Sequence, residues 1–228
     1  MPWPTLPSQC EVCRRFNDAR LCSSCIERFA PTTRRCKHCA LRLDNALEVC
    51  GECLRSPPPF EHTVCAVDYA FPWDRMIVSM KFFDQPELAA TLAALLVQAV
   101  RAAAMPLPAL VLPVPLAPVR LAERGYNQAW ELARRAAAAL HLPAYAALLL
   151  RPIETAHQTE LTRAQRLANL RAAFVVGESQ RTVLAGQRVA LVDDVLTTGA
   201  TAQEATLALL RGGAAAVDVW VIARTAED

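Results

Sequence analysis

Eight of the nine cysteines fall between residues 10 and 53, and this clustering limits the fold more than any other feature of the sequence. They form four C-x-x-C pairs, separated by 8, 10 and 10 residues: Cys10/Cys13, Cys22/Cys25, Cys36/Cys39 and Cys50/Cys53. Two thiolates two residues apart can bind one Zn²⁺, so two pairs complete a tetrahedral site and four pairs complete two. The pattern therefore predicts an N-terminal module that holds two structural zinc ions with all eight cysteines as ligands.

The cysteine pattern leaves two questions open. Disulfides or an iron–sulfur cluster are the less favoured alternatives to zinc. Sequential pairing, first pair with second and third with fourth, would give two small ribbons, whereas interleaved pairing would give a cross-braced module. Residues 1–59 hold nine Lys or Arg and six Asp or Glu, so contact with nucleic acid stays an alternative to the structural role that we favour.

Composition narrows the class of protein. Hydrophobic residues make up 54% of the sequence and charged residues 20%, which is enough apolar material for a core. The net charge of +2 argues against a strongly electrostatic nucleic-acid binder. Prolines interrupt the longest apolar run, residues 102–119, and exclude it as a membrane span. Residues 1–8 lack the pattern of a secretory signal, so we expect a cytoplasmic protein with reduced cysteines.

The rest of the sequence has the alternating pattern of an α/β domain. A run of prolines at 57–59 marks the expected boundary between the zinc-binding module, residues 1–59, and a second domain, residues 60–228. Apolar and β-branched runs predict strands at 63–71, 109–115, 188–193 and 217–223, and amphipathic runs predict helices at 73–83, 86–104, 127–140 and 201–211. Tight strand–helix–strand joints predict right-handed βαβ units and a parallel sheet flanked by helices.

The segment RVALVDDVLTTGAT, residues 188–201, carries the clearest sign of a binding site. A buried strand delivers Asp193 and Asp194 to the edge where open α/β sheets bind ligands. The Thr and Gly residues that follow open a helix, where N–H groups and hydroxyls suit a phosphate dianion and Gly199 permits close approach. Because carboxylates would repel that phosphate unless they face hydroxyl groups, the segment predicts a sugar phosphate. A Mg²⁺-binding acid pair before an ordinary helix cap is the alternative.

This segment resembles the binding signature for phosphoribosyl pyrophosphate (PRPP) in type I phosphoribosyltransferases. The resemblance assigns PRPP binding to Asp193, Asp194, Thr197, Thr198, Gly199, Ala200 and Thr201. With the four cysteine pairs, the proline-rich joint and matches such as Met80-Lys81-Phe82, nearly the whole chain resembles the ComF/GntX family. Membership implies the type I phosphoribosyltransferase fold, with a small hood, behind a double zinc ribbon. For some members it also implies a role in DNA uptake during natural transformation.

The resemblance also suggests ligands for the diphosphate. Basic and glycine residues follow strand 109–115 where this fold has its pyrophosphate loop, and one lysine is a further candidate: Arg120, Arg124, Gly125 and Lys81. An ordinary basic turn is the alternative. Residues 154–171 resemble the loop that closes over the site in this fold, which assigns catalytic roles to Gln158, Arg163 and Arg166. Mg²⁺ would accompany PRPP.

These features lead us to expect a PRPP-binding, phosphoribosyltransferase-like protein of the ComF type. As an enzyme it would displace pyrophosphate from C1′ of PRPP with a nitrogen nucleophile. Thr197 stands where 6-oxopurine enzymes of this fold have an Asp, which argues against purine salvage and leaves the acceptor base unassigned. The alternative is a non-catalytic PRPP or nucleotide sensor, or an adaptor that contacts single-stranded DNA or DNA-uptake proteins. The sequence assigns no oligomeric state.

Overall fold

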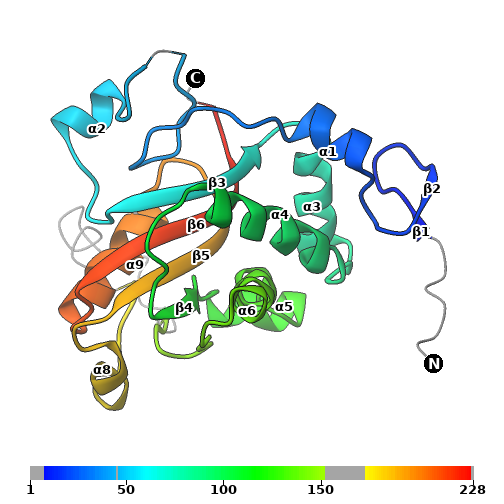
Figure 1. Cartoon of the computed structure of the whole chain (residues 1–228). Coiled ribbons are helices and arrows are strands. Elements are labelled where there is room, and N and C mark those ends of the chain that lie inside the picture. The colour runs from blue at the N-terminus through cyan, green and yellow to red at the C-terminus, as the bar shows by residue number, and fades with distance from the viewer. Residues whose placement is uncertain (1–7, 45, 152–172, 227–228) are drawn as a thin grey trace, which may run out of the picture.

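A four-stranded parallel sheet in the order β3-β6-β5-β4 lies at the centre of the molecule (Figure 1). The computed structural model describes residues 8–44, 46–151 and 173–226. The strands of the sheet are β3 (His62–Asp68), β4 (Leu110–Pro113), β5 (Arg188–Leu196) and β6 (Ala216–Arg224). All nine residues of β6 are buried, because it pairs with a strand on either side and is covered on both faces. The predicted parallel sheet is confirmed.

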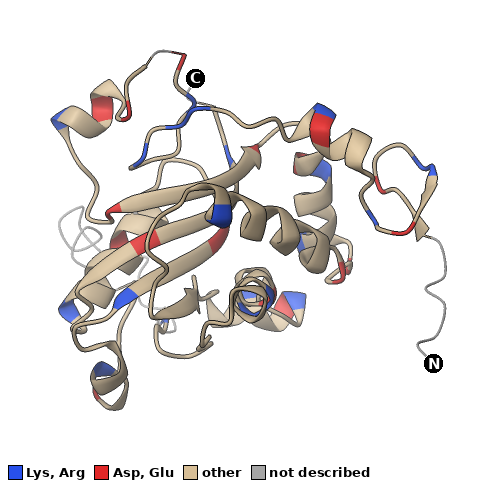
Figure 2. Cartoon of the chain, in the orientation of Figure 1, with Lys and Arg blue, Asp and Glu red and all other residues tan. Residues whose placement is uncertain are grey.

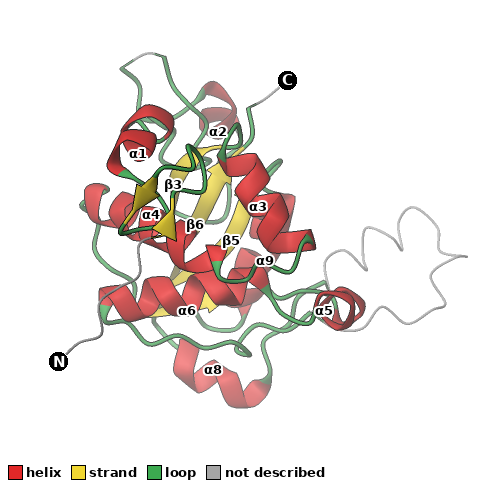
Figure 3. Ribbon diagram, turned by 90° about the vertical axis from the view of Figure 1, so that its right-hand side faces the viewer, coloured by secondary structure: helices red, strands yellow, loops and turns green. Residues whose placement is uncertain are grey.

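Helices cover both faces of this sheet (Figure 3). Along β5 and β6 the side chains alternate between two apolar layers: Ala190, Val192 and Trp220 pack with helices α4 and α6, whereas Leu191 and Val219 pack with α9. The helices of this domain are α3 (Trp73–Phe82), α4 (Leu88–Ala102), α5 (Pro118–Arg124), α6 (Gln128–Leu140), α8 (Glu178–Leu184) and α9 (Ala200–Arg211). The sheet flanked by helices is the predicted fold class.

The sequence patterns located most of these elements. Asn127 caps α6 as expected, since its side chain accepts hydrogen bonds from the N–H groups of Ala129 and Trp130 at 2.9 and 3.3 Å. The first predicted strand ends earlier than expected, at Asp68 rather than residue 71, because the chain turns there and Pro72 has no N–H for a ladder. Strand β5 runs three residues beyond the predicted end, to Leu196, so the acid pair lies within it.

One segment differs in kind from the expectation. The residues after β4 were expected to form a pyrophosphate loop, but residues 118–124 form the short helix α5. Pro118 occupies its first turn, where a missing N–H costs nothing, and Gly125 ends it at φ 78° in the left-handed region. The basic side chains of this segment therefore project from a helix and its cap.

The cysteine-rich segment forms two small units that pack against the sheet domain. The first contains the hairpin β1 (Ser8–Gln9) and β2 (Phe16–Asn17) and helix α1 (Ser23–Phe29); the second contains α2 (Gly51–Arg55). The Trp73 indole donates a hydrogen bond to the Phe29 carbonyl at 2.7 Å, and Arg35 pairs with Asp68 at 2.7 Å. Both units therefore contact the sheet domain through polar interactions. The domain boundary at residue 59 stays a prediction.

Charge is mixed across the surface. Figure 2 shows acidic and basic residues side by side on both α1 and α2. Within the described ranges, the longest apolar helices fall short of what is needed to cross a bilayer.

The central layer predicts where stability resides. Leu191 in β5 is fully buried, so Leu191→Ala should lower the free energy of unfolding by ~2–5 kcal/mol through lost burial and a residual cavity. Leu207→Ala on α9 is the matched control, because Leu207 is 37% exposed and should change stability by ~0.5 kcal/mol or less. Urea unfolding followed by circular dichroism measures both, and equal losses would contradict the assignment of the core.

Candidate functional site

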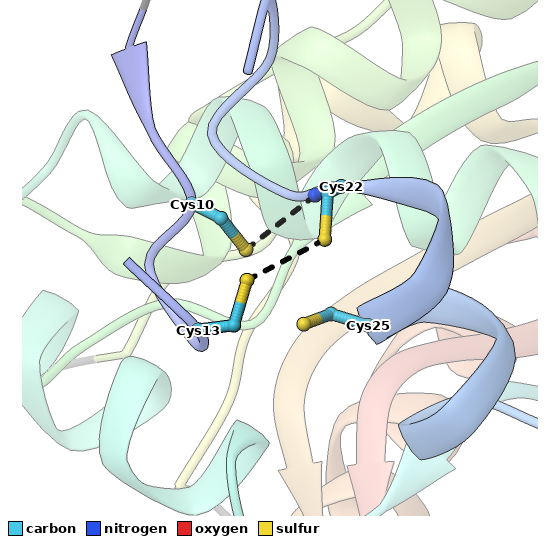
Figure 4. A group of neighbouring side chains, drawn as sticks. All are labelled: Cys10, Cys13, Cys22 and Cys25. Atoms are coloured by element: carbon cyan, nitrogen blue, oxygen red, sulfur yellow. Dashed lines mark hydrogen bonds between the residues drawn. The ribbon is translucent and has the colours of Figure 1, made fainter. Parts of the chain in front are cut away.

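The eight paired cysteines form two separate clusters. Figure 4 shows the first, in which the side chains of Cys10, Cys13, Cys22 and Cys25 converge. The second consists of Cys36, Cys39, Cys50 and Cys53. In each cluster the ligand atoms all lie within 4.8 Å of one another. The pairing is therefore sequential, which decides the question that the spacing left open and gives two ribbon-like units.

The geometry of both clusters fits zinc. A tetrahedral Zn²⁺ with Zn–S bonds of ~2.3 Å separates its sulfur atoms by about 3.8 Å. Cys13 Sγ and Cys22 Sγ are 3.7 Å apart, and Cys39 Sγ and Cys50 Sγ are 3.6 Å apart. A disulfide would need about 2.05 Å, and all nine cysteines are free thiols. Four sulfur ligands close the coordination shell, as in structural rather than catalytic zinc sites.

Backbone N–H groups stabilise a thiolate at the start of each cluster. The N–H of Cys22 points to Cys10 Sγ at 3.5 Å, and the N–H of Cys50 points to Cys36 Sγ at 3.3 Å. Burial raises the pKa of Cys10, but these backbone hydrogen bonds outweigh burial and lower the pKa to about 6. The same balance lowers the pKa of Cys36 to about 7. Other members of the clusters differ: burial raises the pKa of Cys25 to about 12 and that of Cys39 to about 11.

The two remaining residues of interest near the clusters are not ligands. His38 lies outside both clusters, and its Nδ1 is 2.7 Å from the Glu61 carbonyl. Cys65 is a core residue of β3, and burial raises its pKa to about 11.

The acid pair lies near the C-terminal end of β5. Asp194 is only 3% exposed and its Oδ2 lies 2.8 Å from Lys81 Nζ on α3. This is a charge contact, since among the described residues Oδ2 has no hydrogen-bond partner of regular geometry. Asp193 Oδ1 accepts a hydrogen bond from the N–H of Asp194 at 2.8 Å. Burial raises the pKa of Asp193, and the neighbouring carboxylate of Asp194 raises it further.

A large cavity beside Lys81 gathers the predicted diphosphate ligands. It measures about 740 Å³, and Lys81, Arg120, Arg124 and Gly125 all line it. The Arg124 guanidinium donates to Gln128 and lies 5.1 Å from the centre of the Phe82 ring. Arg120 is exposed at the rim. The structure therefore brings these four predicted residues together in the wall of one hollow, which also includes the acidic residues Asp84 and Glu123.

The loop after β5 borders a different and smaller cavity. Thr197, Thr198 and Gly199 line a hollow of about 190 Å³, together with Gln203 and Arg224. Gly199 has φ 80°, a conformation that side chains disfavour, so the residue type is required for this turn into α9. Ala200 and Thr201 are exposed in the first turn of α9. Residues of the second cysteine cluster, Cys39 and Cys53, form another part of the wall.

The predicted site is thus divided into two hollows. The acid pair lies on the strand that leads into the turn beside the smaller hollow, and Asp194 contacts Lys81 in the wall of the larger one. The predicted catalytic residues Gln158, Arg163 and Arg166 lie outside the described residues. Sequence reasoning missed Arg224, a buried cation in the wall of the smaller cavity. Its signal in the sequence was a cationic residue at the end of a strand that is apolar apart from Asp218.

The fold and these clusters define the class of protein: an α/β domain with a parallel sheet flanked by helices, preceded by a module of two Cys₄ clusters with the geometry of metal sites. The sequence is 35% identical over 228 residues to DNA utilization protein YhgH of Salmonella typhi, covering 97% of this chain and 99% of that one. It is 36% identical over 208 residues to competence protein F of Haemophilus influenzae, covering 90% of each. The chain belongs to the family of these two proteins. No protein-family profile matches it.

Two solved structures align with part of the chain. Glutamine phosphoribosylpyrophosphate amidotransferase of B. subtilis, complexed with ADP and GMP, aligns with a TM-score of 0.46 and 20% identity. The allosteric regulatory enzyme of purine biosynthesis aligns with a TM-score of 0.42 and 18% identity. Each alignment covers 63% of this chain but only 30% and 29% of the respective solved chain.

Sequential pairing predicts the result of removing ligands two at a time. Cys13→Ser with Cys22→Ser should leave one zinc ion per chain, and so should Cys39→Ser with Cys50→Ser, because each double change removes half of one tetrahedral site. Cys65→Ser is the control and should keep two. Metal analysis of the purified proteins measures this. Interleaved pairing would instead empty both sites in either double variant.

The raised pKa of Asp193 predicts a pH-dependent gain in stability when its charge is removed. In the folded protein this carboxyl holds its proton to higher pH than in the unfolded chain, so wild-type stability falls as pH rises from the unfolded pKa through the folded pKa. Asp193→Asn should raise the free energy of unfolding by ~0.5–2 kcal/mol above that window.

The gain should disappear below the unfolded pKa of about 3.9, where both side chains are neutral. Urea unfolding over a pH series measures it. Asp44→Asn, whose side chain is 97% exposed in the wild type, is the control and should show no such trend. A gain of equal size at every pH would argue against a perturbed Asp193.

Proposed function

We propose that this protein binds PRPP at the end of β5 and the loop that follows. The observation that carries the proposal is the acid pair of β5, continued by a Thr-Thr-Gly turn into α9, next to a cavity lined by Lys81, Arg120 and Arg124. One ligand that carries a phosphate, a pair of hydroxyls and a diphosphate accounts for all three parts.

Each part suits a different group of PRPP. Asp193 and Asp194 accept hydrogen bonds from the ribose 2′ and 3′ hydroxyls, which removes the repulsion that a phosphate would meet there. The N–H groups and hydroxyls of residues 197–201 hold the 5′-phosphate at the start of α9. The left-handed conformation at Gly199 supports this role, because it requires a residue without a side chain where the phosphate would approach the turn.

The larger cavity suits the diphosphate. Arg120 and Arg124 donate to its oxygens in the forked geometry that guanidinium groups offer, and Gly125 lets the ligand approach the backbone. Lys81 is paired with Asp194 in the ligand-free protein and exchanges this partner for the diphosphate when PRPP binds. Mg²⁺, bound with PRPP, would neutralise part of the diphosphate charge.

The cysteines suggest which metal the two clusters hold and in which cellular compartment the protein is found. We propose Zn²⁺ as the ion of both Cys₄ clusters, because the donor set and the sulfur separations match it. Nine free thiols suit a reducing compartment, which supports a cytoplasmic location.

If the protein is an enzyme, a nitrogen nucleophile forms the new bond to C1′ while the bond from C1′ to the diphosphate oxygen breaks, and the nucleophile loses a proton. Charge on the leaving diphosphate is stabilised by the basic groups of the larger cavity. We propose that Arg163, Arg166 and Gln158 contribute to this step, as the family resemblance implies.

The relatives' names suggest the process served. They are called a DNA utilization protein and a competence protein, and we propose that this protein also acts in the handling of DNA taken up by the cell. Single-stranded DNA and proteins of DNA uptake are the proposed partners.

Removal of the acid pair tests PRPP binding. Asp193→Ala with Asp194→Ala should weaken PRPP binding by at least ~100-fold, because two charge-assisted sets of hydrogen bonds are lost. Titration calorimetry with PRPP and Mg²⁺ measures the affinity, and circular dichroism checks the fold. Asp44→Ala is the control, since it removes an acid that is 97% exposed. Unchanged affinity in the double variant would overturn the assignment.

Turnover distinguishes an enzyme from a sensor. Release of pyrophosphate from PRPP is measured with a panel of purine, pyrimidine and other nitrogen bases. Turnover with one base identifies the acceptor. Tight PRPP binding without turnover across the panel would instead support the non-catalytic sensor.

A further inference from the structure

Arg224, the last residue of β6, links the second cysteine cluster to the end of β5. Its Nε donates a hydrogen bond to the Cys39 carbonyl at 3.0 Å, and its Nη1 donates to the Leu196 carbonyl at 3.4 Å and to the Thr225 carbonyl at 2.7 Å. Cys39 is a member of the second cluster, and Leu196 directly precedes the Thr-Thr-Gly turn. With 6% of its surface exposed, Arg224 is held in place by these contacts.

The cavity beside this arginine brings the same two parts together. Its wall includes Thr197, Thr198 and Gly199 of the turn, Cys39 and Cys53 of the second cluster, and Arg224. The second cluster therefore forms part of the surroundings of the proposed phosphate position. A shift of the cluster backbone would move one side of this cavity and one hydrogen-bond partner of Arg224.

The charge of the second cluster also affects whether a phosphate can bind in this cavity. Four thiolates and one Zn²⁺ carry a formal charge of −2, which would repel a phosphate in the same cavity. Arg224 supplies a positive charge to the cavity wall, and Glu52 in the same wall supplies a negative one. The Arg224 guanidinium therefore offsets part of the negative charge that a phosphate next to the cluster would meet.

The first cluster has different surroundings. Within the described part of the chain, none of its four cysteines lines this cavity. Its unit contacts the domain through Phe29 and Trp73, and through an ion pair between Arg20 and Glu87 at 3.7 Å. These contacts lie at the starts of α3 and α4, on elements that do not form the phosphate turn.

We propose that Arg224 is a positioning residue that couples the metal of the second cluster to the phosphate turn. Retention of that metal and binding of a sugar phosphate therefore strengthen each other, whereas the metal of the first cluster is independent of the ligand. This inference rests on the proposed phosphate site.

The first test uses the unmodified protein with both metals. Coupling is reciprocal, so a bound sugar phosphate must make the second metal harder to remove. The protein is mixed with a chromogenic zinc chelator, with and without saturating ribose 5-phosphate, which needs no Mg²⁺. At equilibrium with the chelator, we expect the ligand to raise the apparent affinity of the second site for its metal by about tenfold and to leave that of the first site unchanged.

The two metals are told apart by a variant. Protein with Cys13→Ser and Cys22→Ser holds the second metal alone. It therefore shows how much of the metal taken by the chelator comes from the second site. Equal protection of both metals, or of neither, would overturn the coupling.

The second test compares two arginines at the same junction. Arg35 also joins the second unit to the domain, through its ion pair with Asp68, and donates to the Ala40 carbonyl within the unit rather than to Leu196. Arg224→Gln should weaken ribose 5-phosphate binding by roughly 10- to 100-fold in calorimetry, because a buried, hydrogen-bonded cation is lost. Arg35→Gln should bind like wild type. Arg224→Lys keeps the charge without the fork and should recover part of the affinity.

The outcomes separate this inference from the function on which it rests. If wild type binds neither ribose 5-phosphate nor PRPP, the proposed function fails and the coupling fails with it. If wild type binds but Arg224→Gln binds equally well, the coupling is wrong and the proposed function stands. If Arg224→Gln does not fold, the chelator measurement on wild type decides alone.

Discussion

The ladder between β5 and β6 is the constraint on which the candidate site depends. Eight register pairs join the two strands, from Arg188 opposite Ala216 to Leu196 opposite Arg224. Because both strands end at the same edge, the ladder brings the acid pair, the phosphate turn and Arg224 to one side of the sheet. The carboxylates can lie this deep only because the layers on both faces of the sheet fix their backbone. A site on a mobile loop would not hold Asp194 within 2.8 Å of Lys81, which lies on helix α3.

The sequence predicted what depends on short-range chemistry. The strand with its acid pair and turn, the Asn127 cap and the four cysteine pairs are each determined by residues close together in the chain. Helix α5 was missed although Pro118 and Gly125 mark its two ends, because family resemblance favoured a loop there. Its start and stop signals were in the sequence and were given too little weight.

Long-range contacts could not be predicted in the same way. The pairing of Lys81 with Asp194 and the bond from Arg224 to Cys39 join residues that no periodicity relates. The division of the site into two hollows likewise arises from how the second cysteine unit packs against the turn. Sequential pairing of the cysteines was equally hidden, since both pairings use the same spacing. Such features depend on tertiary packing, which local patterns do not encode.

Strand β3 has a consequence for how the protein is made. It is the first strand of the sheet to be synthesised, yet among the described residues its one partner strand is β6, the last. His62 and Asp218, which face each other across this pair, are 156 residues apart. During translation the apolar strand β3 therefore stays unpaired until almost all of the domain has left the ribosome. Slow, non-local closure of this kind exposes a chain to aggregation. Early binding of metal by the cysteine units would order the segment just before β3. It would thereby shorten the part of the chain that is still unfolded when β3 and β6 pair.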